Sequence, residues 1–296
     1  MARGGKMIDK NILTTKKTIE HLSALCRDQS VPCWALAFEI TNAYKTINAA
    51  SFSTLFDLCS YGGQGGNPTL YEAGKLTALQ LDSDLSAHHL NNDYHNADHL
   101  KQVLINTFVI SQLSDRKGIQ PPPLDLLIAA MIHDVNHDGS TNTVNGKHIP
   151  FRLEDKSMAY ARPLFKAAWV DDQTIRDIQT MLRWTDLAGR AEDMVKAYPE
   201  GLRPDVAEKA KMLGDADLLP AIGLTGPQAC KENEKLGLEW DKPLSTRNFR
   251  SFVKGVAGNG FQSQGAKYFN PNIERVVAYM DSLSHKKHAV GIAPSP

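Results

Sequence analysis

Four ionisable side chains crowd into one short stretch of the chain. His133, Asp134, His137 and Asp138 fall within six residues, directly after the apolar run Leu124–Ile132. Histidine and aspartate are rarely buried unless a hydrogen bond, an opposite charge or a metal ion satisfies them. Neutral imidazoles and carboxylates together suit a borderline divalent cation such as zinc. The stretch is therefore a candidate for metal chemistry.

Two more places in the sequence carry the same residue types. His95 and His99 lie four residues apart, a spacing that on a helix puts both rings on one face, one turn apart. Asp217 comes much later, in GDADLLP, after another amphipathic pattern. Taken singly, each feature is more often a surface accident, a helix cap or a solvated turn. Taken together, two neutral imidazoles and two carboxylates from these places would make a mixed nitrogen and oxygen site for one divalent cation.

Helical patterns dominate the elements that must position these residues. An amphipathic pattern covers residues 93–113, with Asn92 or Asp93 as its expected N-terminal cap. Three prolines, Pro121–Pro123, open the next helix, which ends at the His133 stretch. No run of residues alternates as a strand would. The sequence therefore predicts an all-α, compact multi-helix fold.

A glycine cluster at Tyr61–Leu70 interrupts the helical patterns. It lacks the lysine and hydroxyl residue of a phosphate-binding loop, so we interpret it as a flexible connector. A boundary there would separate an N-terminal helical cap region, residues 1–66, from a core at residues 67–284. The tail, residues 285–296, is expected to be disordered.

Composition narrows the function classes. The 296 residues carry no formal net charge, which gives no reason to expect a nucleic acid or an anionic membrane as a partner. No segment has the apolar length of a membrane span or of a signal-peptide core. The four cysteines form no CxxC pair and are expected to be reduced thiols in or near the core. We expect a cytoplasmic location, in a bacterium or in a host cell that receives a secreted effector.

The motifs together resemble those of the class I 3′,5′-cyclic-nucleotide phosphodiesterases, within the superfamily of HD-domain metal-dependent phosphohydrolases. YHNADH is similar to that family's Y-H-N-x-x-H, and HDVNHDGSTN to its H-D-x-x-H-x-G-x-x-N. LED at Leu153–Asp155, WTDL at Trp184–Leu187 and DADLLP are similar to its L-E-N, A-T-D-M and C-A-D-L-S-N-P. Order and approximate spacing agree over residues 94–220. The resemblance implies an all-helical catalytic domain.

The resemblance also implies two divalent metal ions. The first, expected to be zinc, would be bound by His99, His133, Asp134 and Asp217. The second, Mg²⁺ or Mn²⁺, would share Asp134 and otherwise be held mainly by water, which suits an ion that keeps its hydration shell. The side chains that contact those waters would be His137, Glu154, Thr185 and Asp186.

The implied reaction is hydrolysis of a phosphodiester, most simply of a 3′,5′-cyclic nucleotide to the 5′-monophosphate. Two cations would neutralise the substrate and lower the pKa of a bridging water, so that a metal-bridging hydroxide is the nucleophile. His95 would be the general acid that protonates the departing sugar oxygen. Glu232 or Glu234 could favour its protonated form, and the residues alone do not decide between them.

The sequence identifies the residues of the small-molecule substrate pocket less clearly than it identifies the metal ligands. Tyr94 and Asn142 would line it by the same resemblance. The family holds its purine with a glutamine and an aromatic clamp, and that glutamine cannot be placed in residues 245–265, where Gln262 and Gln264 come late and beside glycines. Asn248 could substitute for it, and Phe249 or Phe252 could stack on a base, although their i, i+3 spacing is equally typical of a core face.

Two other functions stay open. One is an HD-type phosphohydrolase that acts on another nucleotide or phosphoester, which the missing glutamine favours. The other is a non-catalytic metal-containing protein, a ligand-binding sensor or effector. The presence of His95 argues against it, because a protein that only holds a metal has no use for a proton donor.

Overall fold

The computed structural model describes residues 10–64, 66–86, 90–115, 120–187, 190–241, 246–258 and 260–290. Within these ranges the chain is helical apart from one short hairpin, as the sequence predicts. The α-helices are α1 (Lys10–Arg27), α2 (Cys33–Ala49), α3 (Phe52–Cys59), α4 (Pro68–Ser86), α5 (Ala97–Ser114), α6 (Leu124–Ile132), α7 (Arg152–Ala167), α8 (Asp172–Arg183), α9 (Arg190–Ala197), α10 (Pro204–Ile222), α11 (Gly226–Glu239), α12 (Thr246–Ala257) and α13 (Asn270–Val290). The remaining elements are the 3₁₀ turns η1 (Tyr61–Gly63) and η2 (Ala266–Phe269) and the antiparallel strands β1 (Thr143–Val144) and β2 (Lys147–His148).

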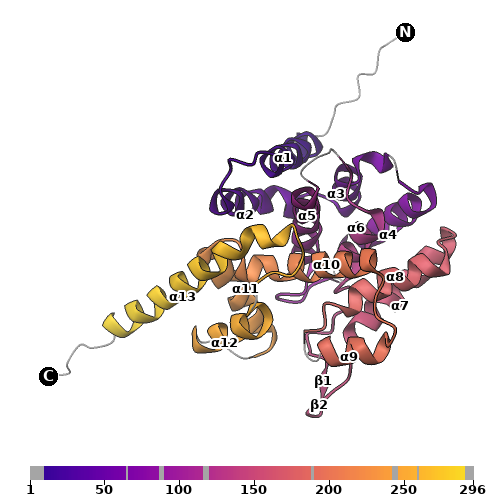
Figure 1. Cartoon of the computed structure of the whole chain (residues 1–296). Helices are drawn as coiled ribbons and strands as arrows, with labels where there is room; N and C mark the ends of the chain where they lie inside the picture. Colours follow the sequence, from indigo (N-terminus) through magenta and orange to yellow (C-terminus); the bar gives the residue numbers. More distant parts are fainter. Residues whose placement is uncertain are drawn as a thin grey trace, which may run out of the picture.

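Helix α5 is the centre of the fold, with α1, α2, α6 and α10 packed against it (Figure 1). It is buried on nearly every side. The side chain of Asn96 caps it by accepting a hydrogen bond from the backbone N–H of His99, at 3.1 Å. The helix therefore begins at Ala97 and not near Asp93, so the predicted one-turn relation of His95 to His99 is wrong. His95 lies in the segment that leads into the cap.

Helix α10 continues through a proline because α5 supplies the missing hydrogen bond. Pro220 lies inside α10 and has no N–H to donate to the carbonyl of Ala216. Asn106 of α5 donates to that carbonyl instead, at 3.0 Å, and its own side-chain oxygen accepts from the hydroxyl of Tyr44 at 2.9 Å. A side-chain amide therefore joins α5 to α10 next to Asp217, which lies within the helix.

The N-terminal helices share the core of the rest of the chain. Buried side chains of α1, α2 and α3, such as Leu22, Ile40 and Phe56, belong to the same apolar cluster as those of α5, α6 and α10. The connector after α3 has two consecutive glycines with positive φ, Gly62 at 64° and Gly63 at 75°, a backbone that glycine adopts without strain. The predicted interruption is therefore present, and a domain boundary there remains a prediction.

Helix α13 runs further than the sequence suggests. The structure continues it to Val290, into the tail from residue 285 onward for which disorder remains a prediction, and residues 291–296 lie outside the described ranges. Between Asn272 and Val290 the sequence has no glycine or proline to stop a helix. Figure 1 shows α13 projecting away from the body of the molecule.

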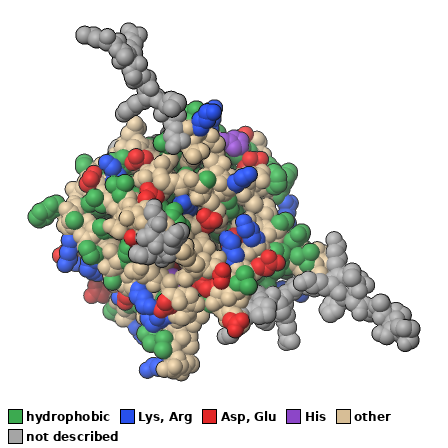
Figure 2. All heavy atoms as spheres, turned by 180° about the vertical axis from the view of Figure 1, so that it is seen from behind, with side chains coloured by type: hydrophobic (Ala, Val, Ile, Leu, Met, Phe, Trp, Pro, Cys, Tyr) green, Lys and Arg blue, Asp and Glu red, His purple; other side chains and the backbone are tan. Residues whose placement is uncertain are grey.

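The surface carries mixed charges. On the face in Figure 2, lysine and arginine side chains are interspersed with aspartate and glutamate. Among the described helices, none is both long enough and apolar enough to cross a membrane. The cysteines are free thiols, with Cys26 and Cys59 buried and Cys33 and Cys230 half-buried, as the sequence predicts.

Candidate active site

Four predicted ligands from three separate parts of the chain come together. His99 lies in the first turn of α5, His133 and Asp134 follow α6, and Asp217 projects from α10. One ligand atom from each lies within 4.8 Å of all the others. The Nε2 atom of His99 is 3.1 Å from Asp217 Oδ1 and 3.3 Å from Asp134 Oδ2, and His133 Nε2 is 3.0 Å from Asp134 Oδ2.

This donor set fits a divalent cation. Tetrahedral zinc with bonds of 2.0–2.1 Å would place its ligand atoms roughly 3.3 Å apart. The observed separations scatter around that distance, and the Nε2 atoms of His99 and His133 face each other at 3.2 Å. The Nδ1 atom of His133 donates to the carbonyl of Ala130 at 3.0 Å, so the neutral ring turns the lone pair of Nε2 toward the cluster.

Opposite charges also hold this cluster together. Burial opposes a charge on His99 and His133, but Asp134 and Asp217 outweigh it and raise the pKa of both rings. Burial likewise opposes ionisation of the two carboxyl groups, and the imidazoles reverse this and hold the pKa of Asp134 and Asp217 below the usual range. A cation must displace protons from these rings, so its affinity is expected to fall in acid.

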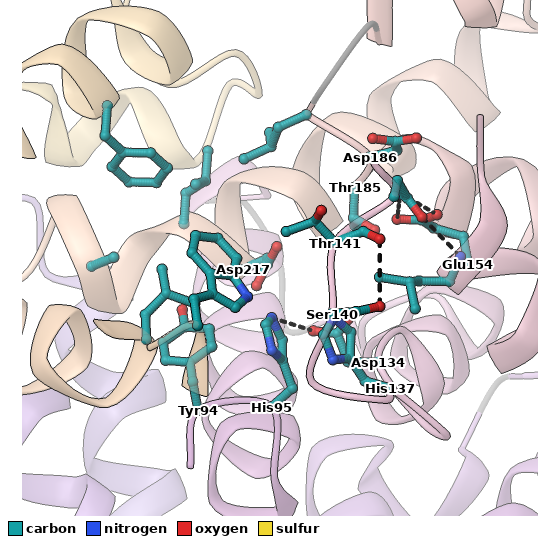
Figure 3. Close-up of a pocket in the computed structure, with 18 of the residues that line it drawn as sticks. Tyr94, His95, Asp134, His137, Ser140, Thr141, Glu154, Thr185, Asp186 and Asp217 are labelled. Carbon is teal, nitrogen blue, oxygen red and sulfur yellow. Dashed lines mark hydrogen bonds and ion pairs between the residues drawn. The ribbon is translucent and has the colours of Figure 1, made fainter. Parts of the chain in front are cut away.

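His95 is held beside the cluster by a carboxylate. Its Nδ1 atom lies 2.5 Å from Oε1 of Glu239, and Oε2 of Glu239 accepts from the backbone N–H groups of Tyr94 and His95 at 2.8 and 2.9 Å. On the opposite edge of the ring, Nε2 lies 3.9 Å from Asp134 Oδ2 (Figure 3). The His95 ring stacks on His137 with centroids 3.6 Å apart.

The acidic neighbour of His95 is thus neither of the two predicted residues. Glu232 is buried and accepts hydrogen bonds from Gln228 and Lys235, and Glu234 is exposed. Sequence analysis missed Glu239 because it lies 144 positions from His95 and matches no motif. Only the packing of the end of α11 against the segment before α5 reveals it.

Burial and pairing give the groups around His95 different charge states. Burial works against ionisation of Glu239, but the hydrogen bond from His95 outweighs it and lowers the pKa of this carboxyl to about 2. Burial lowers the pKa of His137 to about 4. Its neutral ring accepts a hydrogen bond from the backbone N–H of Gly139 at 3.1 Å. Near pH 7 an ionised Glu239 and a neutral His137 therefore surround His95.

Glu154 and Asn142, with Thr185 and Asp186, line the other side of the same cavity (Figure 3). Asn142 Nδ2 donates to Glu154 Oε2 at 3.0 Å, and Asn142 Oδ1 accepts from the backbone of Leu153. Burial, followed by the charge of Asp186, raises the pKa of Glu154 to about 8. Thr185 Oγ1 donates to a backbone carbonyl, and Asp186 accepts from a backbone N–H. The sequence predicts water-mediated contacts to a metal ion for Glu154, Thr185 and Asp186 and a place in the substrate pocket for Asn142, and these roles remain proposals.

The cavity has a volume of about 230 Å³ and two chemically different ends. We call the end at His95, Asp134 and Asp217 the ionic end. The apolar end lies between α10, α11 and α12 and is lined by Leu218, Ala221, Leu236, Trp240 and Phe252. Tyr94 also lines the cavity, and burial raises its pKa, so the phenol stays protonated.

The structure separates the two phenylalanines that the sequence predicts as base contacts. Phe252 lines the apolar end, where stacking on a base remains a prediction. Phe249 is fully buried in the apolar core and is not among the residues that line the cavity. Its prediction as a pocket residue is therefore corrected, because its side chain packs inside the core. The side chain of Asn248 lies outside the described part of the chain. Trp240, which no sequence pattern marks, lines the cavity instead.

Comparison with known proteins supports the fold. No family model and no curated protein matches the sequence. Among solved structures, LmjPDEB1 in complex with IBMX is 13% identical with a TM-score of 0.56, over 92% of this chain and 98% of that one. The phosphodiesterase domain of the RhoPDE fusion protein from the choanoflagellate Salpingoeca rosetta is 15% identical with a TM-score of 0.54, over 83% and 99%. The chain therefore has the all-α fold of phosphodiesterase domains.

Proposed function

We propose that this chain is a metal-dependent phosphodiesterase that hydrolyses a 3′,5′-cyclic nucleotide to the 5′-monophosphate. One observation carries the proposal: an imidazole held by a buried carboxylate, His95 with Glu239, lies beside four side chains that could hold a metal ion, and two of these four, Asp134 and Asp217, line the same cavity as His95. The fold shared with phosphodiesterase domains agrees with it.

His99, His133, Asp134 and Asp217 would hold the first metal ion, and Asp134 would also contact the second. We expect zinc at the first site and Mg²⁺ or Mn²⁺ at the second. Bound there, divalent ions would neutralise the phosphoryl oxygens and make a water nucleophilic near neutral pH. His137, Glu154, Thr185 and Asp186 line the same cavity and would orient water molecules there.

His95 would supply the proton that the leaving sugar oxygen needs. The Glu239 carboxylate accepts a hydrogen bond from the Nδ1–H of His95 and so fixes the ring orientation. That leaves Nε2 directed away from Glu239, on the side of Asp134. A proton on Nε2 can then pass to an alkoxide that forms there.

The two ends of the cavity suit the two parts of a nucleotide. A phosphoryl group would lie at the ionic end, and a flat heterocycle would fit between Leu236 and Phe252 at the apolar end. LmjPDEB1, which shares the fold, binds IBMX. No glutamine is among the described residues that line the cavity. This favours, as a second candidate, a related phosphohydrolase that acts on another nucleotide or phosphoester.

A substrate panel tests the proposal. Cyclic mononucleotides, cyclic dinucleotides and simple phosphoesters are incubated with the full chain and added Mn²⁺ or Mg²⁺. We expect a 5′-monophosphate from a cyclic mononucleotide, and elemental analysis should find zinc with a second divalent ion. Turnover restricted to a monoester or a cyclic dinucleotide would support the second candidate. Metal-loaded protein that hydrolyses none of the compounds would contradict both.

A further inference from the structure

The side chains that line the cavity are unusual for a site that binds an anionic substrate. Among its described lining residues, none is lysine or arginine. Five are acidic: Asp134, Glu154, Asp186, Asp217 and Glu232. Any phosphoryl oxygen that does not face a metal ion must therefore be bound by a histidine or by a neutral donor. This makes each unused neutral donor in the wall a candidate substrate contact.

Trp240 carries such a donor. Its indole Nε1 is buried and has no hydrogen-bond acceptor within the described part of the protein, and the residue lines the cavity. An indole N–H can only donate, and tryptophan normally finds a partner for this group when it is buried. A buried donor without an acceptor is destabilising, so a native structure that keeps one needs an explanation.

The position of Trp240 in the chain puts it at the part of the apolar end that is nearest to His95. Asn233, Leu236 and Trp240 follow i, i+3, i+7 spacing along α11, and all three line the cavity. Trp240 comes directly after Glu239, whose carboxylate is bonded to His95. Asn233 lies about two turns before Trp240 in the sequence of α11, which at 1.5 Å per residue is about 10 Å away. The indole is therefore at the His95 end and the amide at the far end.

We infer that the Trp240 indole N–H donates a hydrogen bond to a phosphoryl oxygen of the bound substrate. The nature of that substrate rests on the proposed function. The contact adds a neutral donor where the apolar end meets the ionic end, close to a region in which a cationic side chain would compete with the metal ions for Asp134 and Asp217. It also explains why the indole keeps an unsatisfied N–H in the free protein: the acceptor arrives with the ligand.

Binding of matched ligands tests this contact. The probes are adenosine and guanosine 5′-monophosphates and the corresponding nucleosides, titrated into ¹⁵N-labelled full chain loaded with Zn²⁺ and Mg²⁺. The four tryptophans give four indole N–H signals, and Trp240→Phe identifies one by its loss. We expect that signal to move downfield and to exchange more slowly with solvent when a monophosphate binds, and not when a nucleoside binds.

Affinity measurements complete the test. Trp240→Phe should bind the monophosphate about 10-fold more weakly, as expected for a hydrogen bond to a charged group, and the nucleoside equally well. The matched control is Trp169→Phe, since Trp169 is 88% exposed and does not line the cavity. If Trp240→Phe does not fold, the same substitution at Trp34, Trp169 and Trp184 identifies the Trp240 signal by elimination.

The possible results separate this inference from the proposed function. An equal loss of affinity for monophosphate and nucleoside would indicate a contact with the base and overturn the inference. So would an indole signal that does not respond to the monophosphate, even if cyclic nucleotides are hydrolysed. A responsive indole signal in protein that hydrolyses no phosphodiester would support the contact and overturn the proposed function.

Discussion

The two ends of the cavity are built in different ways. The side chains of the ionic end lie in or directly beside α5, α6 and α10, which pack against one another in the core. His99 and His133 are almost fully buried there. The apolar end lies between α10, α11 and α12, and α12 is at the lower edge of the molecule in Figure 1. The side chains of Trp240 and Phe252 at this end are only half-buried. A metal site demands fixed positions, whereas a surface that binds a flat ring needs only shape and apolar area.

The largest effect is expected from Asp217→Ala at the ionic end. The substitution removes one of four ligands, so the protein should lose its first metal and about 10³-fold or more in turnover. Elemental analysis and cyclic-nucleotide hydrolysis measure the two losses. Asp205→Ala is the control, because Asp205 is an exposed acid at the start of the same helix. Full metal content and activity in Asp217→Ala would disprove the ligand assignment.

The second largest effect is expected at His95. His95→Ala should retain its metal and lose about 10²–10⁴-fold in turnover of a substrate with an alkoxide leaving group. A nitrophenyl phosphodiester should be affected much less, because its leaving group needs little protonation. Glu239→Gln should show the same dependence on the leaving group with a smaller loss. Equal losses on both substrates would argue that His95 binds rather than protonates.

The two phenylalanines of α12 allow a direct comparison of core and cavity. Phe249→Ala should lower the free energy of unfolding by about 3–5 kcal/mol, because it leaves a void in the core. Phe252→Ala should cost less stability and instead raise KM for the nucleotide, with kcat nearly unchanged. Urea denaturation and steady-state kinetics distinguish the two. A larger loss of stability in Phe252→Ala would reverse our assignment of the two side chains.

The smallest effect concerns the pH dependence of stability. The pKa of Glu154 is raised from 4.5 to about 8 on folding. Between these values the folded chain holds a proton that the unfolded chain has lost. Its stabilising contribution is complete below about pH 4.5 and is lost as the pH rises toward 8, at about 1 kcal/mol per pH unit.

Glu154→Gln should remove this slope. Urea denaturation of chelator-treated protein at pH 5, 6, 7 and 8 compares the variant with the wild type. The variant should show a flatter dependence of unfolding free energy on pH over this range. Parallel curves for the two proteins would show that Glu154 is not protonated in the folded state.

The two ends also differ in how far the sequence could predict them. The ionic end was predictable because each ligand sits beside a recognisable helix pattern: His133 and Asp134 follow an apolar run that had to be buried. The position of His95 relative to α5 could not be predicted, because the capping side chain of Asn96 starts the helix four residues later than the amphipathic pattern suggests. At the apolar end, periodicity alone could not distinguish Phe249 from Phe252, since both lie on one side of an amphipathic helix.

The sequence by itself determined the helical class, because that class depends on residue type and local periodicity, and its motifs predicted the four candidate ligands and His95 through their resemblance to the phosphodiesterases. Tertiary structure alone decided that Glu239 orients His95, that Trp240 enters the cavity, and that Asn106 allows α10 to continue past Pro220. Each of these contacts joins residues more than a hundred positions apart or depends on which way a helix end turns. Local sequence preferences do not predict such contacts, because the contacts form only when the helices pack together.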